Sequence, residues 1–320
     1  MNVVETIEET RRTLEPSREG SIGLVPTMGS LHEGHLALLR AARAENETVV
    51  MSLFVNPAQF GDASDLAKYP RDEKHDLQLA REAGVDLVFA PSTDEMYPPG
   101  FQTWVDVTEL GGILEGRFRP GHFRGVATVV LKLLNVVRPT CVYFGQKDAQ
   151  QVAVIRQLVA DLAVEVELRI VPTVRDDDGL ALSSRNARLT AEERTAALAL
   201  PRALATRDRD AALAELASSN GLEVDYVEVA DEDEISAGLV GEAAARCVVG
   251  GHHDDRLSAR LHLRKLGDRE LARRRGRGRR PLWADAHSVS PSSGTLSMRR
   301  VEPTRTAPAS TGGSKSATST

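Results

Sequence analysis

Short apolar runs alternate with stretches of helical spacing through the first half of the chain. Strands are predicted where a run of apolar, often β-branched residues stops at proline or glycine, and helices where apolar residues recur every three or four positions. The predicted strands span residues 22–25, 48–55, 85–90, 141–144 and 165–171, and the predicted helices span residues 33–45, 72–83, 125–137 and 149–162. Strands that alternate with helices favour a parallel sheet with right-handed crossovers, so we expect an α/β fold with a Rossmann-like, doubly wound sheet.

A different pattern follows Thr173. Thr190 precedes an alanine and two glutamates, which is typical of a helix start because the threonine side chain and the acids interact with free backbone N–H groups. Helical spacing continues from there, and residues 222–229 alternate enough to predict a strand. We therefore expect a Rossmann-like domain over residues 1–173 and a smaller α+β lid domain over residues 174–250.

Composition divides the chain again at the end of the predicted lid. Residues 251–320 hold 15 Lys and Arg against 6 Asp and Glu, whereas residues 1–250 hold 25 against 40. The basic segment is rich in Arg, Ser, Thr and Pro and cannot bury enough apolar surface to offset its ordering entropy, so we expect a mostly disordered tail. Because the change is abrupt, we hypothesise that the reading frame is disrupted near Gly250. Resequencing that recovers an unbroken frame encoding this tail contradicts the hypothesis.

Targeting and membrane signals are missing from the sequence. The chain has no apolar run of membrane-spanning length, and residues 1–15 lack the apolar core of a secretory signal. Its two cysteines, Cys141 and Cys247, give no disulfide framework. We therefore expect a cytoplasmic protein with no membrane partner.

Three segments rich in polar and glycine residues lie where predicted strands end, at residues 26–35, 56–60 and 145–151. In open α/β sheets, ligands bind beyond the carboxyl ends of the strands. A further basic patch, of three arginines around a histidine, lies within residues 117–124. Few aromatic residues interleave it, so it indicates an anionic small substrate rather than nucleic acid.

His32 and His35 lie three residues apart where a predicted strand turns into a helix. The first turn of that helix offers free N–H groups and a positive dipole end, and the two imidazoles add donors for phosphate. Gly29 and Gly34 allow the backbone to approach a ligand closely. Taken alone, such a pair is more often two surface histidines. Zinc is disfavoured because no further Cys or His cluster supplies ligands.

Two later segments carry similar chemistry. Lys147 can place a point charge on phosphate, and Asp148 can hold a sugar hydroxyl, a metal ion or a neighbouring lysine. Residues 182–186 combine two serine hydroxyls with a guanidinium and could clamp a triphosphate, although a solvated loop with a helix cap is the simpler interpretation. Residues 252–255, His-His-Asp-Asp, have metal-ligand chemistry but consecutive side chains point in different directions, so we expect no metal there.

Taken together, these segments resemble the pantothenate synthetase (pantoate–β-alanine ligase) family of the nucleotidyltransferase superfamily, which has a His-x-Gly-His signature. The resemblance covers roughly residues 1–235, and the ordered set of motifs is far more specific than any one of them. The matching stretches are residues 25–35, 54–60, 69–71, 114–116, 119–126, 144–148 and 182–186. The resemblance implies ATP-dependent condensation of pantoate with β-alanine to pantothenate, AMP and pyrophosphate, through a pantoyl adenylate. It also implies a homodimer, Mg²⁺ carried by ATP without protein ligands, and no prosthetic group.

Site residues follow from the matching positions. The implied ATP-binding residues are Met28, Gly29, Ser30, Leu31, His32, Glu33, Gly34, His35, Gly145, Gln146, Lys147, Asp148, Val174, Leu182, Ser183, Ser184 and Arg185. The implied catalytic residues are His35 as proton donor, with His32, Lys147, Arg185, Ser183 and Ser184. Gln59 and Gln151 are implied to hold pantoate, and Gln59 is implied to face β-alanine as well.

Three positions depart from the family pattern without removing a catalytic group: Leu182 replaces a methionine, Gln146 a glutamate and Ala149 a tyrosine. Two rival interpretations stay open. Another His-x-Gly-His nucleotidyltransferase shares the phosphate chemistry but does not account for residues 56–60 or 119–126. A degraded, non-catalytic homologue whose tail binds a polyanion is the second.

Overall fold

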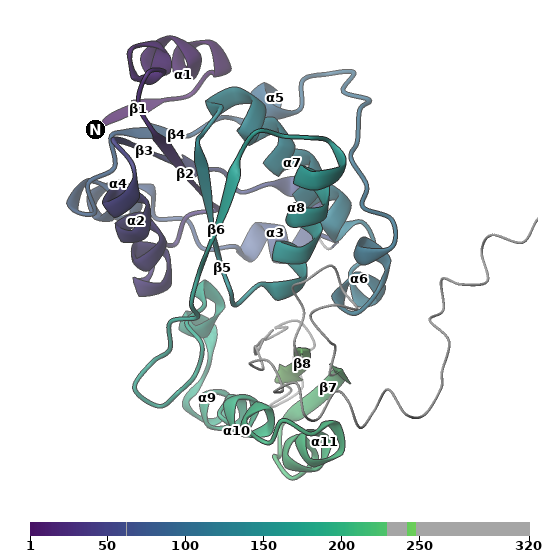
Figure 1. The fold of residues 1–320 in the computed structure, drawn as a ribbon. Coiled ribbons are helices and arrows are strands. Elements are labelled where there is room, and N and C mark those ends of the chain that lie inside the picture. Colours follow the sequence, from purple (N-terminus) through teal and green to yellow (C-terminus); the bar gives the residue numbers. More distant parts are fainter. Residues whose placement is uncertain (62, 229–241, 248–320) are drawn as a thin grey trace, which may run out of the picture. The chain divides into compact units, whose positions relative to one another are not determined.

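A computed structural model describes residues 1–61, 63–228 and 242–247 of the chain (Figure 1). The predicted disordered tail over residues 251–320, the motif at residues 252–255 and the proposed frame disruption near Gly250 all lie outside the described residues. No helix in the described part of the chain is long and apolar enough to span a membrane.

The predicted parallel sheet is confirmed. It contains β1 (Asn2–Val4), β2 (Ile22–Thr27), β3 (Thr48–Leu53), β4 (Leu87–Phe89), β5 (Cys141–Gly145) and β6 (Glu167–Val171). Their order across the sheet is β1-β4-β3-β2-β5-β6, and every neighbouring pair is parallel. The chain winds outward from β2 in one direction and resumes at β5 on its other side. The carboxyl ends of β2 and β5 therefore flank the point where the winding reverses, which is where open α/β sheets bind ligands.

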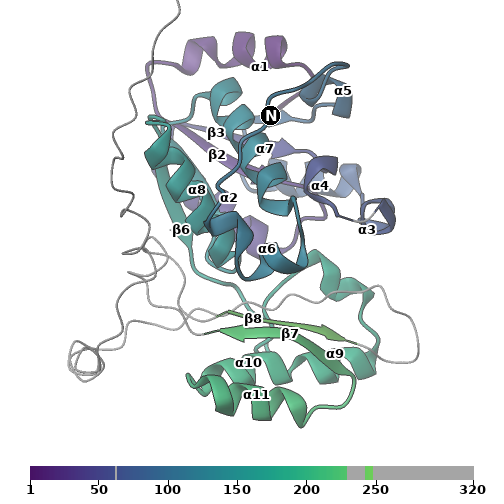
Figure 2. The same cartoon turned by 90° about the vertical axis from the view of Figure 1, so that its right-hand side faces the viewer.

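Helices pack on both faces of this sheet (Figure 2). The helices of this part of the chain are α1 (Ile7–Leu14), α2 (Glu33–Glu45), α3 (Ala63–Lys68), α4 (Glu73–Glu82), α5 (Thr93–Met96), α6 (Glu115–Phe118), α7 (His122–Val137) and α8 (Ala149–Asp161). Alternate residues of each strand point to opposite faces, so β2 contributes Leu24 to the cluster containing α1, α7 and α8. Its neighbour Val25 joins the cluster with α2 and α4 on the other face.

One predicted helix start needs correction, and two elements were not predicted. The helix predicted from residue 125 begins at His122, because Gly121 adopts a left-handed conformation with φ of 81° and turns the chain into the helix there. The elements β1 and α1 were not predicted. Helix α1 begins with a capping box in which Thr6 accepts from the Glu9 N–H and Glu9 accepts from the Thr6 N–H.

The region after β6 has its own small hydrophobic clusters. It contains α9 (Ala191–Ala197), α10 (Ala199–Ala205), α11 (Arg209–Ala217) and an antiparallel pair, β7 (Leu222–Glu228) and β8 (Glu242–Cys247). Leu200, Leu204, Leu216 and Val227 form one cluster there. The strand predicted over residues 222–229 corresponds to β7. The predicted domain boundaries stay predictions.

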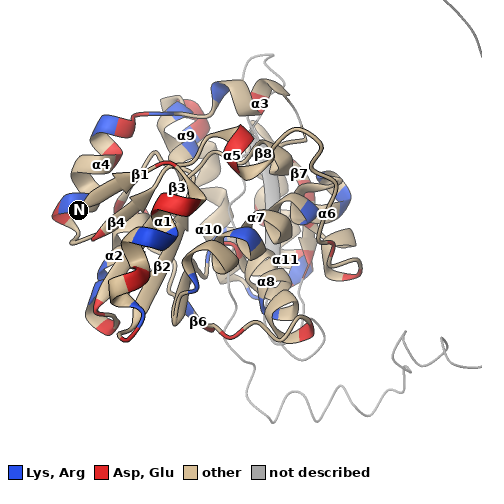
Figure 3. Cartoon of the chain, turned by 90° about the horizontal axis from the view of Figure 1, so that it is seen from above, with Lys and Arg blue, Asp and Glu red and all other residues tan. Residues whose placement is uncertain are grey.

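Charged positions of both signs are interspersed over α1, α2 and α4 (Figure 3). The acidic side chains on these helices therefore lie next to arginine and lysine side chains and do not form a patch of one sign.

Candidate active site

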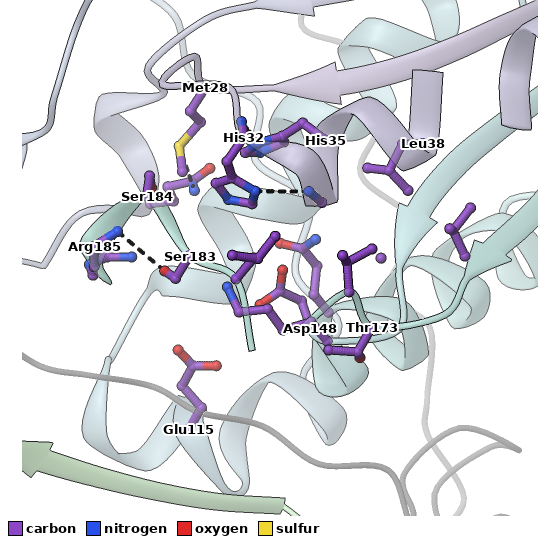
Figure 4. Close-up of a pocket in the computed structure, with 18 of the residues that line it drawn as sticks. Met28, His32, His35, Leu38, Glu115, Asp148, Thr173, Ser183, Ser184 and Arg185 are labelled. Atoms are coloured by element: carbon purple, nitrogen blue, oxygen red, sulfur yellow. Dashed lines mark hydrogen bonds between the residues drawn. The ribbon is translucent and has the colours of Figure 1, made fainter. Parts of the chain in front are cut away.

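A pocket of about 180 Å³ lies at the carboxyl ends of β2 and β5 (Figure 4). It is lined by parts of all three strand-end segments together with the loop that follows β6. The predicted site residues that line it are Met28, His32, Gly34, His35, Gln59, Gly145, Lys147, Asp148, Gln151, Val174, Leu182, Ser183, Ser184 and Arg185. Residues separated by more than 150 positions in the sequence therefore share one cavity.

Five predicted ATP-binding residues do not line this pocket. Gly29 and Ser30 form the turn after β2, both with positive φ, and the N–H groups of Ser30 and Leu31 donate to Asp76 at 2.9 and 2.7 Å. Leu31 is buried in the core. Glu33 is exposed and pairs with Arg40, and the backbone N–H of Gln146 donates to β6. Gly29, Ser30 and Leu31 therefore shape the turn, and Asp76 is a support that the sequence did not reveal.

The two histidines fix each other at the start of α2. The N–H of Gly34 donates to His32 Nδ1 at 3.1 Å, and the N–H of His32 donates to His35 Nδ1 at 3.3 Å. A nitrogen that accepts a hydrogen bond carries no proton, so each neutral ring holds its proton on Nε2. A Cβ on Gly34 would lie 2.9 Å from the His32 ring, which explains the glycine between them.

Both imidazoles are neutral at pH 7. Burial and the nearby charge of Lys147 lower the pKa of His32 to about 4. Burial, His32 and Lys147 together hold the pKa of His35 well below its usual value. Each ring therefore offers an Nε2–H that can donate a hydrogen bond to an anion without first taking up a proton.

Cations reach the pocket from two sides. Lys147 follows β5 and has no ion-pair partner among the described residues. Arg185 comes from the loop after β6, where its Nη2 lies 3.0 Å from Asp65 Oδ2 and its N–H donates to Ser183 Oγ. Ser184 Oγ lies 3.4 Å from the Tyr69 hydroxyl. The loop is thus connected to the α3 region through side chains that also face the cavity.

Hydrogen bonds fix the orientation of the Gln59 side chain. Its Oε1 accepts from Asn56 Nδ2 at 3.0 Å, and its Nε2 lies 3.1 Å from Met28 Sδ. Asn56 is itself oriented, because its Oδ1 accepts from the Tyr97 hydroxyl at 2.8 Å. A Cβ on Gly125 would meet the backbone of this turn at 2.3 Å, so a glycine there lets the turn pack on α7.

Several pocket residues were not among the predicted site residues: Phe60, Tyr69, Glu115, Arg119 and His122. The sequence marked three arginines near His122 as one basic patch, but only Arg119 of these lines the pocket. Arg117 is exposed, and the guanidinium of Arg124 lies 4.9 Å from the Trp104 ring centroid. The direction of each arginine depends on the short helix α6 and on the turn at Gly121, which residue types alone did not reveal.

Within residues 1–61, 63–228 and 242–247, no group of three or more His, Cys, Asp and Glu side chains is arranged to hold a metal ion. Asp148 lies just after β5 and contributes a carboxylate to the pocket lining (Figure 4).

Comparisons with known proteins give a consistent result. A family model described as pantoate–β-alanine ligase matches residues 2–255. A pantothenate synthetase from Thermotoga neapolitana is 51% identical over 250 residues, which cover 73% of this chain and 89% of the relative. A solved pantothenate synthetase from Thermus thermophilus is 45% identical, with a TM-score of 0.75 over 82% of this chain and 99% of that one. A pantoate–β-alanine ligase from Francisella tularensis, complexed with beta-gamma ATP and β-alanine, is 34% identical, with a TM-score of 0.72 over 82% and 97%.

Proposed function

Because the chain belongs to the pantoate–β-alanine ligase family, we propose that this pocket joins pantoate to β-alanine through a pantoyl adenylate formed from ATP. The observation that carries the proposal is the convergence of two kinds of group in one cavity. His32, His35 and Lys147 offer donors to phosphate, while Gln59 and Gln151 offer amides to a hydroxy acid. An enzyme that adenylates a carboxylate needs both kinds at the same place.

The proposed reaction has two steps, adenylation of pantoate and then amide formation. A carboxylate is a poor electrophile, so an oxygen of the pantoate carboxylate first attacks the α-phosphorus of ATP, and pyrophosphate leaves. The uncharged amine of β-alanine then attacks the acyl carbon, a proton is lost, and AMP leaves as the amide forms. Anionic pantoate must approach an anionic triphosphate, and preorganised donors reduce that repulsion most where charge develops. We assign this role to Lys147 and to the Nε2–H groups of His32 and His35, which line the same pocket.

For His35 we propose a role as a hydrogen-bond donor. The family resemblance implies a proton donor at this position, but a ring whose pKa lies well below its usual value holds no extra proton at pH 7. Its Nε2–H and that of His32 donate to phosphate oxygens and bind more strongly as charge builds on the leaving pyrophosphate. The positive end of α2 adds to the same effect.

The loop at residues 182–185 is proposed to close over the triphosphate. Arg185 is held 3.0 Å from Asp65, so it engages phosphate by exchanging one carboxylate partner for another anion. Both side chains are partly exposed, which makes this ion pair weak enough to exchange. Closure of the loop keeps water from hydrolysing the adenylate.

Mg²⁺ is proposed to arrive with ATP as part of the substrate, where it neutralises phosphate charge.

A homodimer and a cytoplasmic location are proposed from the family resemblance and the cysteine content. Light scattering coupled to size exclusion tests the dimer, and a single-chain mass in solution contradicts it. Cell fractionation tests the location. Enrichment of the protein in membranes or in the medium contradicts a cytoplasmic location.

Substrate omission separates this function from its rivals. ATP, Mg²⁺, pantoate and β-alanine are supplied together, and AMP release is measured again with each acid omitted. We expect sustained AMP release only when both acids are present. Nucleotide transfer to a phosphate acceptor with neither acid required indicates another nucleotidyltransferase. No turnover by folded protein contradicts the proposal and favours a non-catalytic homologue.

A further inference from the structure

A buried network beside Gln59 takes no part in the two steps described above. Arg119 Nη1 donates to Glu115 Oε1 at 2.7 Å and lies 3.2 Å from His122 Nε2. Arg119 Nη2 donates to the backbone oxygen of Gln59 at 3.4 Å. The same oxygen lies 2.8 Å from His122 Nδ1. Four side chains or backbone groups are thus connected into one unit whose members line the pocket.

The tautomer of His122 is determined by its partners. A backbone carbonyl only accepts hydrogen bonds, so Nδ1 carries the proton and donates to Gln59. Nε2 is then free of a proton and accepts from the Arg119 guanidinium. Burial and the charge of Arg119 lower the pKa of His122 to about 3, which keeps this ring neutral. The histidine therefore orients the guanidinium without placing a second positive charge beside it.

Arg119 keeps donors to spare. A guanidinium has five N–H groups, and three of those on Arg119 are directed to Glu115, His122 and Gln59. Its Nε–H and a second N–H on Nη2 have no partner among the described residues. Nε and Nη2 lie on one edge of the planar group, and this edge matches the two oxygens of a carboxylate.

We propose that Arg119 binds the carboxylate of β-alanine and that His122 is the positioning residue that holds the guanidinium for it. The inference rests on the proposed function and names a binding residue within that site. Two arguments select β-alanine over pantoate. The pantoate carboxylate must be given up to the α-phosphorus, whereas the β-alanine carboxylate keeps its charge throughout. β-Alanine is also a zwitterion, and the net-neutral pair of Arg119 and Glu115 suits a zwitterion better than a net anion.

Arg119→Gln tests the proposal through the two half-reactions. The variant keeps an amide donor on a shorter polar side chain but lacks the charge and the fork. We expect the KM for β-alanine to rise about 100-fold, the loss of a bidentate charged pair. Pyrophosphate release with ATP and pantoate alone is expected to change at least tenfold less. An equal loss in both half-reactions, or an unchanged KM for β-alanine, overturns the proposal.

A neutral analogue provides a second readout that folding alone does not change. β-Alaninamide keeps the amine but lacks the carboxylate, so wild-type enzyme is expected to prefer β-alanine by about 100-fold in kcat/KM. Arg119→Gln is expected to lose most of this preference, and undiminished preference contradicts the assignment. If Arg119→Gln does not fold beside the buried Glu115, Arg119→Lys retains the charge and is expected to keep only part of the preference.

Two further variants define the role of His122 and the background. His122→Asn can still donate to the Gln59 oxygen but cannot accept from Arg119, so we expect about a tenfold rise in the KM for β-alanine with kcat little changed. A fall in kcat alone, with KM unchanged, contradicts a positioning role. Arg117→Gln, an exposed arginine on the same short helix, serves as the matched control and is expected to behave as wild type. If wild-type enzyme releases pyrophosphate but Arg119→Gln leaves the KM for β-alanine unchanged, this inference alone is rejected. If wild-type enzyme releases no pyrophosphate, the proposed function is rejected.

Discussion

The two ends of the pocket are built on different principles. At the end proposed to bind phosphate, His32, His35 and Lys147 line the cavity, and Lys147 has no ion-pair partner among the described residues. At the amide end, Gln59 and Arg119 are held by partners on several elements. Free donors can respond to charge that appears only during reaction, whereas a bonded network holds a fixed shape. We therefore expect changes at the phosphate end to lower kcat and changes at the amide end to raise KM.

Lys147→Ala is expected to give the largest loss. Removing the charge that faces the developing pyrophosphate should lower kcat about 10³-fold, within the range for a lost electrostatic stabiliser. The midpoint of thermal unfolding should change little, because no ion pair within the described residues is broken. Steady-state AMP release and circular dichroism melting measure the two effects. Lys74→Ala, at an exposed position, is the control, and near-normal turnover of Lys147→Ala shows that the phosphate end is misassigned.

His35→Ala is expected to lower kcat about 100-fold, because it removes one preorganised hydrogen-bond donor. The pH profile separates donor from acid. A neutral donor whose pKa lies well below 6.5 gives no loss of kcat between pH 6 and 8 from its own titration. A limb in that range that vanishes in His35→Ala indicates a proton donor and contradicts our assignment. His75→Ala, which alters an exposed histidine, is the matched control.

His122 links the amide end to acid stability. Its pKa is about 3 in the folded chain against 6.5 for an ordinary histidine, so between these values the unfolded state binds a proton that the folded state does not. The contribution of His122 to the free energy of unfolding is therefore fully present above pH 6.5 and is lost as the pH falls toward 3. Each pH unit costs up to about 1.4 kcal/mol from this group. Denaturant titrations of wild type and His122→Gln between pH 7 and 4 measure it, and equal slopes contradict the assignment.

Tyr97→Phe tests whether the amide network acts at a distance. The change removes the hydroxyl that donates to Asn56 Oδ1 and retains the ring, which stacks on Trp104. Losing one hydrogen bond of about 1 kcal/mol should raise the KM for pantoate about fivefold while kcat stays constant. Initial rates at varied pantoate concentration measure this. A lower kcat with unchanged KM contradicts the division between the two ends.

Asp65→Asn is expected to give the smallest effect. It frees Arg185 from a partly exposed ion pair that contributes under about 1 kcal/mol, so the KM for ATP should fall about twofold. The effect should shrink at high salt, because exposed charges are screened. Asp72→Asn, at the N-cap of α4 and away from Arg185, is the comparison. A higher KM for ATP in Asp65→Asn shows that Asp65 supports the clamp instead of competing for it.

The sequence predicted the helix that carries His35, and its start at His32, better than the network around Arg119. Helix α2 was predicted with its observed bounds, because a polar residue at His32 and a change of pattern at Asn46 mark both ends locally. The rule that ligands bind at the ends of parallel strands then located the pocket. By contrast, Asp76 supports the turn at Ser30 from 46 residues away, and no local pattern reveals such a contact.

Arg119 shows why the amide end was less predictable. Three nearby arginines look equivalent in sequence, but in the fold Arg119 lines the pocket whereas Arg117 and Arg124 are exposed. The tautomers of the three pocket histidines likewise depend on partners that only the fold brings together. Residue types therefore indicated which functional groups are present, and tertiary contacts determined which of these groups line the pocket and in which tautomer.

The most direct test of the central claim is pyrophosphate release in a single turnover with ATP and pantoate but without β-alanine. If the pocket forms a pantoyl adenylate, a burst of pyrophosphate should match the amount of enzyme while AMP stays bound. Adding β-alanine should then release AMP and pantothenate together. If no pyrophosphate appears until β-alanine is added, the two-step account of this pocket is wrong.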